Sequence, residues 1–191
     1  MITIVSGLPR SGTSLMMQIL KAGGMGILTD DIRRADENNL KGYYEYEKVK
    51  SLMKDNSWLA EADGKALKVI AQLIPFLPDS FEYKVIFMER KIDEIIHSQN
   101  KMIDKLGGKT AIVSPEILKK TFAAQVEKVK SFLAGKPNFK TAFANYNVLI
   151  ENGKDEIERI NSELELNLNL EIAINQIDKT LYRSKGSSSS S

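Results

Sequence analysis

The chain of 191 residues has no cysteine and a single histidine, His97. The missing thiols exclude a disulfide framework and any thiolate metal site, and one imidazole excludes a metal site built from several histidines. No apolar run reaches the ~18 residues that a membrane-spanning helix needs. The N-terminus has no basic segment ahead of an apolar core, which is the pattern of a secretory signal. We therefore expect a cytoplasmic protein without a membrane span.

An excess of charge of one sign is missing too, because the formal net charge is only +2. So small an excess does not predict a nucleic-acid-binding surface. Hydrophobic residues make up 42% of the chain and charged residues 27%, which is ordinary for a globular protein. We expect one domain over residues 1–185 and a flexible Gly/Ser tail at 186–191. No pattern in the sequence indicates an oligomeric state.

Strand patterns alternate with helical patterns along the chain. Short β-branched or aromatic runs predict strands, and apolar residues at helical spacing predict helices. The predicted strands are 2–5, 66–70, 83–88 and 139–144. The predicted helices are one that opens at Thr13, followed by 43–54, 92–106, 115–133, 151–164 and 168–177. This alternation predicts an α/β fold, a three-layer α/β/α sandwich with a mainly parallel central sheet of the P-loop nucleoside triphosphate hydrolase type.

Residues 7–14 (GLPRSGTS) join the first predicted strand to the first predicted helix. A glycine loop at this junction turns its backbone N–H groups inward, and the helix dipole adds partial positive charge, so the segment predicts an anion-binding site. The phosphate-loop template G-x-x-x-x-G-K-[ST] fits at every position except one. Thr13 occupies the lysine position, and the cation of the loop is Arg10 instead.

The run PRSGTS from Pro9 to Ser14 matches P-[KR]-S-G-T-[ST], the phosphosulfate-binding loop of the sulfotransferases, and the chain resembles this family. The resemblance implies a 3′-phosphoadenosine 5′-phosphosulfate co-substrate and no metal. It also implies that Arg10 is catalytic. The donor-binding residues that it implies in the loop are Leu8, Pro9, Arg10, Ser11, Gly12, Thr13 and Ser14.

Two further segments carry the resemblance. Arg90 and Ser98 follow a predicted strand at the spacing of the arginine and serine that bind the donor 3′-phosphate in the family. Residues 39–45 (NLKGYYE) resemble the N-P-x-G-[FY]-x-E segment of bacterial and carbohydrate sulfotransferase-like proteins, with Leu40 in the proline position. The R-K-G-x-x-G segment of the cytosolic animal enzymes is missing. Arg183, in the closing TLYR, is the candidate to replace its contact with the 3′-phosphate.

The expected reaction moves a sulfuryl group to an acceptor hydroxyl or amine. Arg10 would neutralise charge on the leaving phosphate, and Lys68, in the second predicted strand, could add positive charge at the sulfonate. A general base is also needed, and its candidates are Glu45, Asp36, Glu37 and His97. We favour Glu45 because it follows the glycine and tyrosines of the segment 39–45, which resembles the acceptor-side region of the family. The residues do not distinguish a sugar, peptide, lipid or small phenol as the acceptor.

Two other classes remain open from the sequence. A P-loop kinase of nucleotides or small molecules would use the same loop, but with a lysine at position 13 and an acidic Mg²⁺ ligand. A non-catalytic nucleotide-binding protein needs neither a base nor an acceptor site. Equilibrium binding separates the three: a sulfotransferase binds adenosine 3′,5′-bisphosphate without Mg²⁺, a kinase prefers Mg-ATP, and a scaffold binds neither.

Overall fold

The structure is a computed structural model that describes residues 1–30, 32, 42–105, 107 and 114–177. Five parallel strands form the centre of this described part. Their order across the sheet is β2-β3-β1-β4-β5, and every pairing is parallel. The strands are β1 (Ile2–Gly7), β2 (Gly26–Ile27), β3 (Lys65–Lys68), β4 (Tyr83–Glu89) and β5 (Phe139–Asn145). The short strand β2 was not among the predicted strands.

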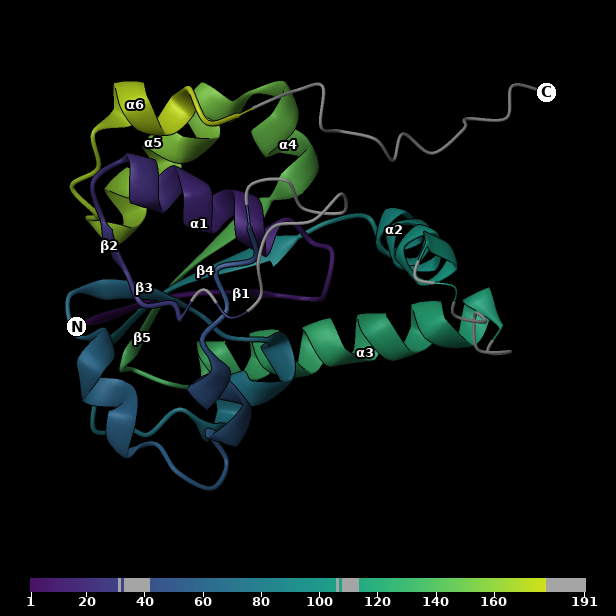
Figure 1. Ribbon diagram of the computed structural model, residues 1–191, viewed down its shortest axis with the longest axis horizontal. Helices are drawn as coiled ribbons and strands as arrows, with labels where there is room; N and C mark the ends of the chain where they lie inside the picture. The colour runs from purple at the N-terminus through teal and green to yellow at the C-terminus, as the bar shows by residue number, and fades with distance from the viewer. Residues whose placement is uncertain (31, 33–41, 106, 108–113, 178–191) are drawn as a thin grey trace.

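Helices cover both faces of this sheet (Figure 1). One face carries α1 (Thr13–Ala22), α4 (Tyr146–Glu151), α5 (Gly153–Leu164) and α6 (Leu170–Ile174). The other carries α3 (Pro115–Ala134) and the 3₁₀ segments η1 (Glu47–Ser51), η2 (Ser57–Ala62) and η3 (Ala71–Phe76), while α2 (Ile92–Lys105) follows β4. The predicted α/β/α architecture with a parallel sheet is confirmed.

Strand β1 lies at the centre of the sheet and is covered on both faces. All six of its residues are buried, as expected for a parallel strand covered on both sides. Ile2 and Ile4 enter the cluster under α3, and Val5 enters the cluster under α1. This burial holds the loop that follows β1 on a rigid support.

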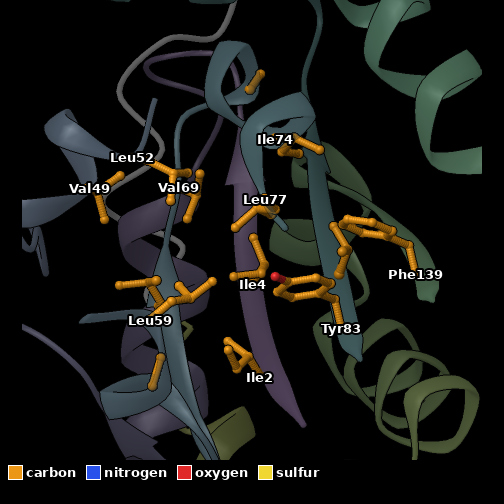
Figure 2. Close-up of a cluster of buried hydrophobic side chains, with 14 of the residues drawn as sticks. Ile2, Ile4, Val49, Leu52, Leu59, Val69, Ile74, Leu77, Tyr83 and Phe139 are labelled. Carbon is orange, nitrogen blue, oxygen red and sulfur yellow. The ribbon is translucent and has the colours of Figure 1, made fainter. Parts of the chain in front are cut away.

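The cluster under α3 is shown in Figure 2, where Ile2 and Ile4 meet side chains from β3, β4 and the 3₁₀ segments. Tyr83 is its largest polar member, and its ring stacks on Phe139 with centroids 4.7 Å apart. The Tyr83 hydroxyl donates a hydrogen bond of 2.9 Å to the carbonyl of Pro78. Burial, with a smaller effect from Asp79, raises the pKa of this hydroxyl well above its ordinary value of 10.0.

Helix boundaries follow local signals at several points. Ser114 caps α3 by accepting a hydrogen bond from the Ile117 amide at 3.3 Å, and Pro115 takes the first turn. Asn145 caps α4 in the same way, with its side chain accepting from two amides. The predicted helix 151–164 corresponds to α5, whereas α4, which ends just before it, was not among the predicted helices.

The largest departure from the sequence prediction is residues 43–54, where only η1 forms. Gly42 and Tyr44 have positive φ angles of 91° and 53°, which an α-helix does not allow. Met53, within this segment, is 62% exposed. The predicted helix 168–177 is similarly reduced to α6. In residues 43–54, tertiary hydrogen bonds of Tyr43 and Glu45, described below, replace the expected helical hydrogen bonds.

Some predictions lie outside the described residues, among them the tail at 186–191 and residues 39–41 of the segment 39–45. Within the described part, no helix has both the length and the apolar composition for crossing a membrane.

We predict that Tyr83→Phe makes stability less sensitive to alkaline pH. A hydroxyl whose pKa is raised by folding stabilises the fold fully below about pH 10, and this contribution falls as the pH rises further, because the unfolded chain loses the proton first. The variant loses about 1 kcal/mol at pH 7 through the Pro78 hydrogen bond. Urea unfolding at pH 7 and at about pH 11 measures both effects, and equal alkaline losses in the two proteins would contradict the prediction.

Candidate anion-binding site

The carboxyl ends of β1, β3 and β4 meet at one edge of the sheet, and the candidate site is built there. β1 pairs with β3 on one side and β4 on the other, so the chain order reverses at this point, where ligands bind in sheets of this kind. The loop 7–14 follows β1, Lys68 ends β3, and Arg90 follows β4 (Figure 1). The structure therefore brings together three of the predicted site elements.

The loop backbone has an unusual conformation at its centre. Arg10 and Gly12 have positive φ angles of 71° and 102°. The Ser11 amide closes a tight turn on the Leu8 carbonyl at 3.1 Å. The N-terminus of α1 is capped only by Gly12, which has no side chain to satisfy the first amides of the helix. Such a helix end, preceded by a tight turn, suits an anion.

Ser11 lies fully buried within this turn. Its hydroxyl has no hydrogen-bond partner among the described residues, and the same holds for Ser6 at the end of β1. Buried polar atoms are normally hydrogen-bonded, so an unpaired hydroxyl inside an anion loop is a donor suited to a ligand oxygen. The residues present thus fit an anionic phosphate group.

Lys68 reaches the loop from the neighbouring strand. The sheet register pairs it with Val5, and its Nζ lies 3.3 Å from Ser14 Oγ and 3.0 Å from the carbonyl oxygen of Tyr43. The side chain is only 12% exposed. The loop itself has no lysine, and β3 therefore supplies an ammonium group at the first turn of α1.

Glu45 lies beside this lysine, with Oε1 3.8 Å from Lys68 Nζ and its side chain 34% exposed. Its backbone carbonyl accepts hydrogen bonds from the Thr29 hydroxyl at 2.9 Å and the Asp30 amide at 3.3 Å. These bonds tie Glu45 to the segment that follows β2, and they account for the missing helix at residues 43–45. The favoured base candidate is thus placed next to a cation of the site and close to solvent.

Arg10 extends to the opposite side, toward α2. Its Nε donates to Ser98 Oγ at 3.0 Å, and its Nη1 lies 3.9 Å from Met102 Sδ. Ser98 is 8% exposed. The two parts of the site that the sequence placed separately, the loop and the segment after β4, are therefore in direct contact.

Arg90 lies beneath the loop. Its Nη1 donates to the Arg10 carbonyl at 3.1 Å, and its Nε pairs with Glu94 Oε2 at 2.9 Å. The side chains of Arg90 and Glu94 are each 7% exposed. Positive φ costs a non-glycine residue about 1–2 kcal/mol, and a hydrogen bond from a charged donor contributes about 1.5–3 kcal/mol. The bond to the carbonyl is therefore large enough to offset the strain at Arg10.

Glu94 and Tyr146 belong to the site but were missed by the sequence reasoning. The available indication was their four-residue spacing, with Arg90 just before the predicted helix 92–106 and Glu94 in its first turn. The guanidinium carbon of Arg90 lies 4.3 Å from the centre of the Tyr146 ring. Burial raises the pKa of the Tyr146 hydroxyl, and the positive charges of Arg90 and Arg10 partly oppose this rise.

A hollow of about 140 Å³ lies beside the loop. Its lining is mainly apolar, and consists of Leu8, Met88, Glu89, Arg90, Ile92, Ile95 and Val126. It is too small for a nucleotide.

The remaining predicted residues are placed as follows. His97 is exposed on α2, next to Ser98, which faces the loop. Asp36, Glu37 and Arg183 lie outside the described residues. Within the described ranges, no three His, Cys, Asp or Glu residues form a group that could hold a metal ion.

We predict that Gly12→Ala is more destabilising than Gly24→Ala. Both glycines have positive φ, 102° and 97°, so both variants carry the same backbone strain, about 1–2 kcal/mol. A Cβ at Gly24 meets nothing within 4 Å, whereas one at Gly12 clashes with Cδ2 of Tyr146. Urea unfolding measures the loss of unfolding free energy in each variant, and the difference between the two losses reports the packing of Tyr146 on the loop. Equal losses would show that this packing contributes nothing to stability.

No family model matches the sequence, and no curated protein matches it at a significant level. Among solved structures, the chain is similar to the crystal structure of an unliganded sugar kinase from Janibacter sp. HTCC2649. The match covers 94% of this chain and 96% of the other, at 15% sequence identity and a TM-score of 0.47. A likeness at this distance gives no functional assignment.

Proposed function

We propose that the protein is a nucleotide-dependent transferase that moves a sulfuryl group from 3′-phosphoadenosine 5′-phosphosulfate to a hydroxyl or amine acceptor. The observation that carries the proposal is the position of Lys68 beside Ser14, with Nζ 3.3 Å from Oγ. In P-loop kinases the Ser or Thr at this position binds Mg²⁺. An ammonium group at this distance repels a divalent cation at the same hydroxyl, so the site favours a ligand that needs no metal.

The same arrangement supplies what a sulfuryl donor requires. The loop amides and the buried Ser11 hydroxyl suit the 5′-phosphate, because they are fixed donors that need not reorganise. Lys68 and Arg10 place positive charge on two sides of the loop. Ser98, in contact with Arg10, stays our prediction for a 3′-phosphate ligand, together with Arg90.

The proposed chemistry is a displacement at sulfur. The acceptor oxygen or nitrogen forms a bond to sulfur while the bond from sulfur to the bridging oxygen breaks, and its electron pair stays on the phosphate of adenosine 3′,5′-bisphosphate. Arg10 and Lys68 stabilise the charge on that leaving group. Glu45 acts as the general base and takes the proton from the acceptor. Its carboxylate already lies 3.8 Å from Lys68 Nζ.

A P-loop kinase of small molecules is the second candidate. Ser14 occupies the position of the metal-binding hydroxyl, and the loop has the length of a phosphate loop. This alternative requires Lys68 to move away from Ser14 when Mg²⁺ binds. It is decided by the nucleotide that the protein prefers.

We predict binding of adenosine 3′,5′-bisphosphate without Mg²⁺, and weaker binding of ATP whether Mg²⁺ is present or not. Lys68→Met should weaken the bisphosphate by at least about tenfold, the effect of one lost charge-assisted hydrogen bond. Lys65→Met is the matched control, because Lys65 begins the same strand and is exposed. Isothermal titration calorimetry measures each affinity. Preference for Mg-ATP would replace the proposal with the kinase, and equal affinities in the two variants would remove Lys68 from the site.

We predict that Glu45→Gln lowers turnover by about 10²–10⁴-fold, the usual contribution of a general base, and changes donor affinity little. Glu47→Gln is the matched control, since Glu47 lies two residues further on and pairs with exposed Lys50. Release of adenosine 3′,5′-bisphosphate is followed with a panel of phenol, sugar and tyrosine-peptide acceptors. Unchanged turnover in Glu45→Gln would show that another group takes the proton.

A further inference from the structure

The buried pair of Arg90 and Glu94 is more completely bonded than a simple surface ion pair. Arg90 Nε binds Glu94 Oε2 at 2.9 Å, and Asn147 Nδ2 donates to the other oxygen, Oε1, at 3.0 Å. The carboxylate is therefore held from both sides, by the residue after β4 and by α4. Buried ion pairs of this kind contribute little net stability, since desolvation cancels most of their attraction. A role in placing other groups is the better account of such a pair.

The group that this pair places is the loop backbone. The second N–H bond of Arg90 runs from Nη1 to the Arg10 carbonyl at 3.1 Å, where the chain has its positive φ of 71°. Tyr146 stacks against the Arg90 guanidinium, 4.3 Å from ring centre to Cζ, and the same ring packs on Gly12. Both positive-φ residues that flank Ser11 are thus held by one connected set of side chains.

We propose that Arg90, Glu94, Tyr146 and Asn147 form a clamp that fixes the loop in its anion-binding conformation. In addition to its predicted contact with the 3′-phosphate, Arg90 then positions the loop through the backbone of Arg10. Glu94 sets the orientation of the guanidinium, and Asn147 sets that of the carboxylate. The functional importance of the clamp rests on the proposed function, but its effect on the loop is measurable in the protein without ligand.

The consequence for the site is that residues from α2 and α4 control the direction of the loop amides. The Ser11 amide bonds to the Leu8 carbonyl at 3.1 Å only while Arg10 keeps its turn. When the clamp is broken, the turn opens, the Ser11 amide becomes accessible to water, and the anion loses preorganised donors. Both changes are local to residues 8–14.

Glu94→Gln is the decisive variant, because it removes the charge and keeps the shape. Amide hydrogen exchange followed by NMR in the ligand-free protein should show at least tenfold faster exchange at Ser11. Amides of β5 should keep their rates, and they serve as the internal reference against global unfolding. Asn147→Ala should act in the same direction with a smaller effect, and it stands in if Glu94→Gln does not fold. Asp93→Asn is the control: it lies on the same helix and breaks the exposed pair with Lys119.

Titration with adenosine 3′,5′-bisphosphate gives the second readout. Glu94→Gln should weaken binding at least tenfold, and Asp93→Asn should leave it unchanged. Unchanged exchange at Ser11 in both Glu94→Gln and Asn147→Ala overturns the clamp. If the wild-type protein does not bind the bisphosphate, the proposed function fails, while the exchange rates still decide whether the clamp exists.

Discussion

The backbone turn between β1 and α1 is the feature on which the rest of the site depends. It must connect a buried strand to a helix within a few residues and leave its amides pointing inward, which requires positive φ at Arg10 and Gly12. Glycine meets this requirement without strain, but Arg10 does not. The surrounding structure supplies the compensation, through the hydrogen bond from Arg90 to the Arg10 carbonyl. The loop is thus a local motif whose conformation is maintained by residues from elsewhere in the chain.

Positive charge is brought to the loop from two directions. The phosphate-loop lysine is replaced by Thr13, and Lys68 supplies an ammonium group from β3 at Ser14. Because Lys68 extends from a strand paired directly with β1, its position is set by the register of the sheet. A cation fixed in this way leaves the first turn of α1 positive without a metal ion, which is the electrostatic basis for proposing a phosphosulfate ligand.

The predicted strands and most predicted helices were confirmed because their patterns are local. β1 and β4 are short runs rich in β-branched and aromatic residues, and α3 has a serine cap and a proline at its start. The helix predicted over residues 43–54 was wrong because of tertiary hydrogen bonds. Lys68 donates to the carbonyl of Tyr43, and Thr29 and Asp30 donate to the carbonyl of Glu45. A helix would use these carbonyls internally, so an apolar period alone could not reveal their partners.

The sequence by itself determined the loop, its missing lysine and the strand-to-helix junction for which an anion site is predicted, because each depends on residues adjacent in the chain. Only the tertiary structure decided which side chains surround the loop. Lys68 meets Ser14 across 54 positions, and Arg90 meets the Arg10 carbonyl across 80. Glu94, Tyr146 and Asn147 carry no motif, and they belong to the site only because the fold packs α2 and α4 against it. Parallel strand pairing produced these contacts, since it gathers the carboxyl ends of distant strands at one edge.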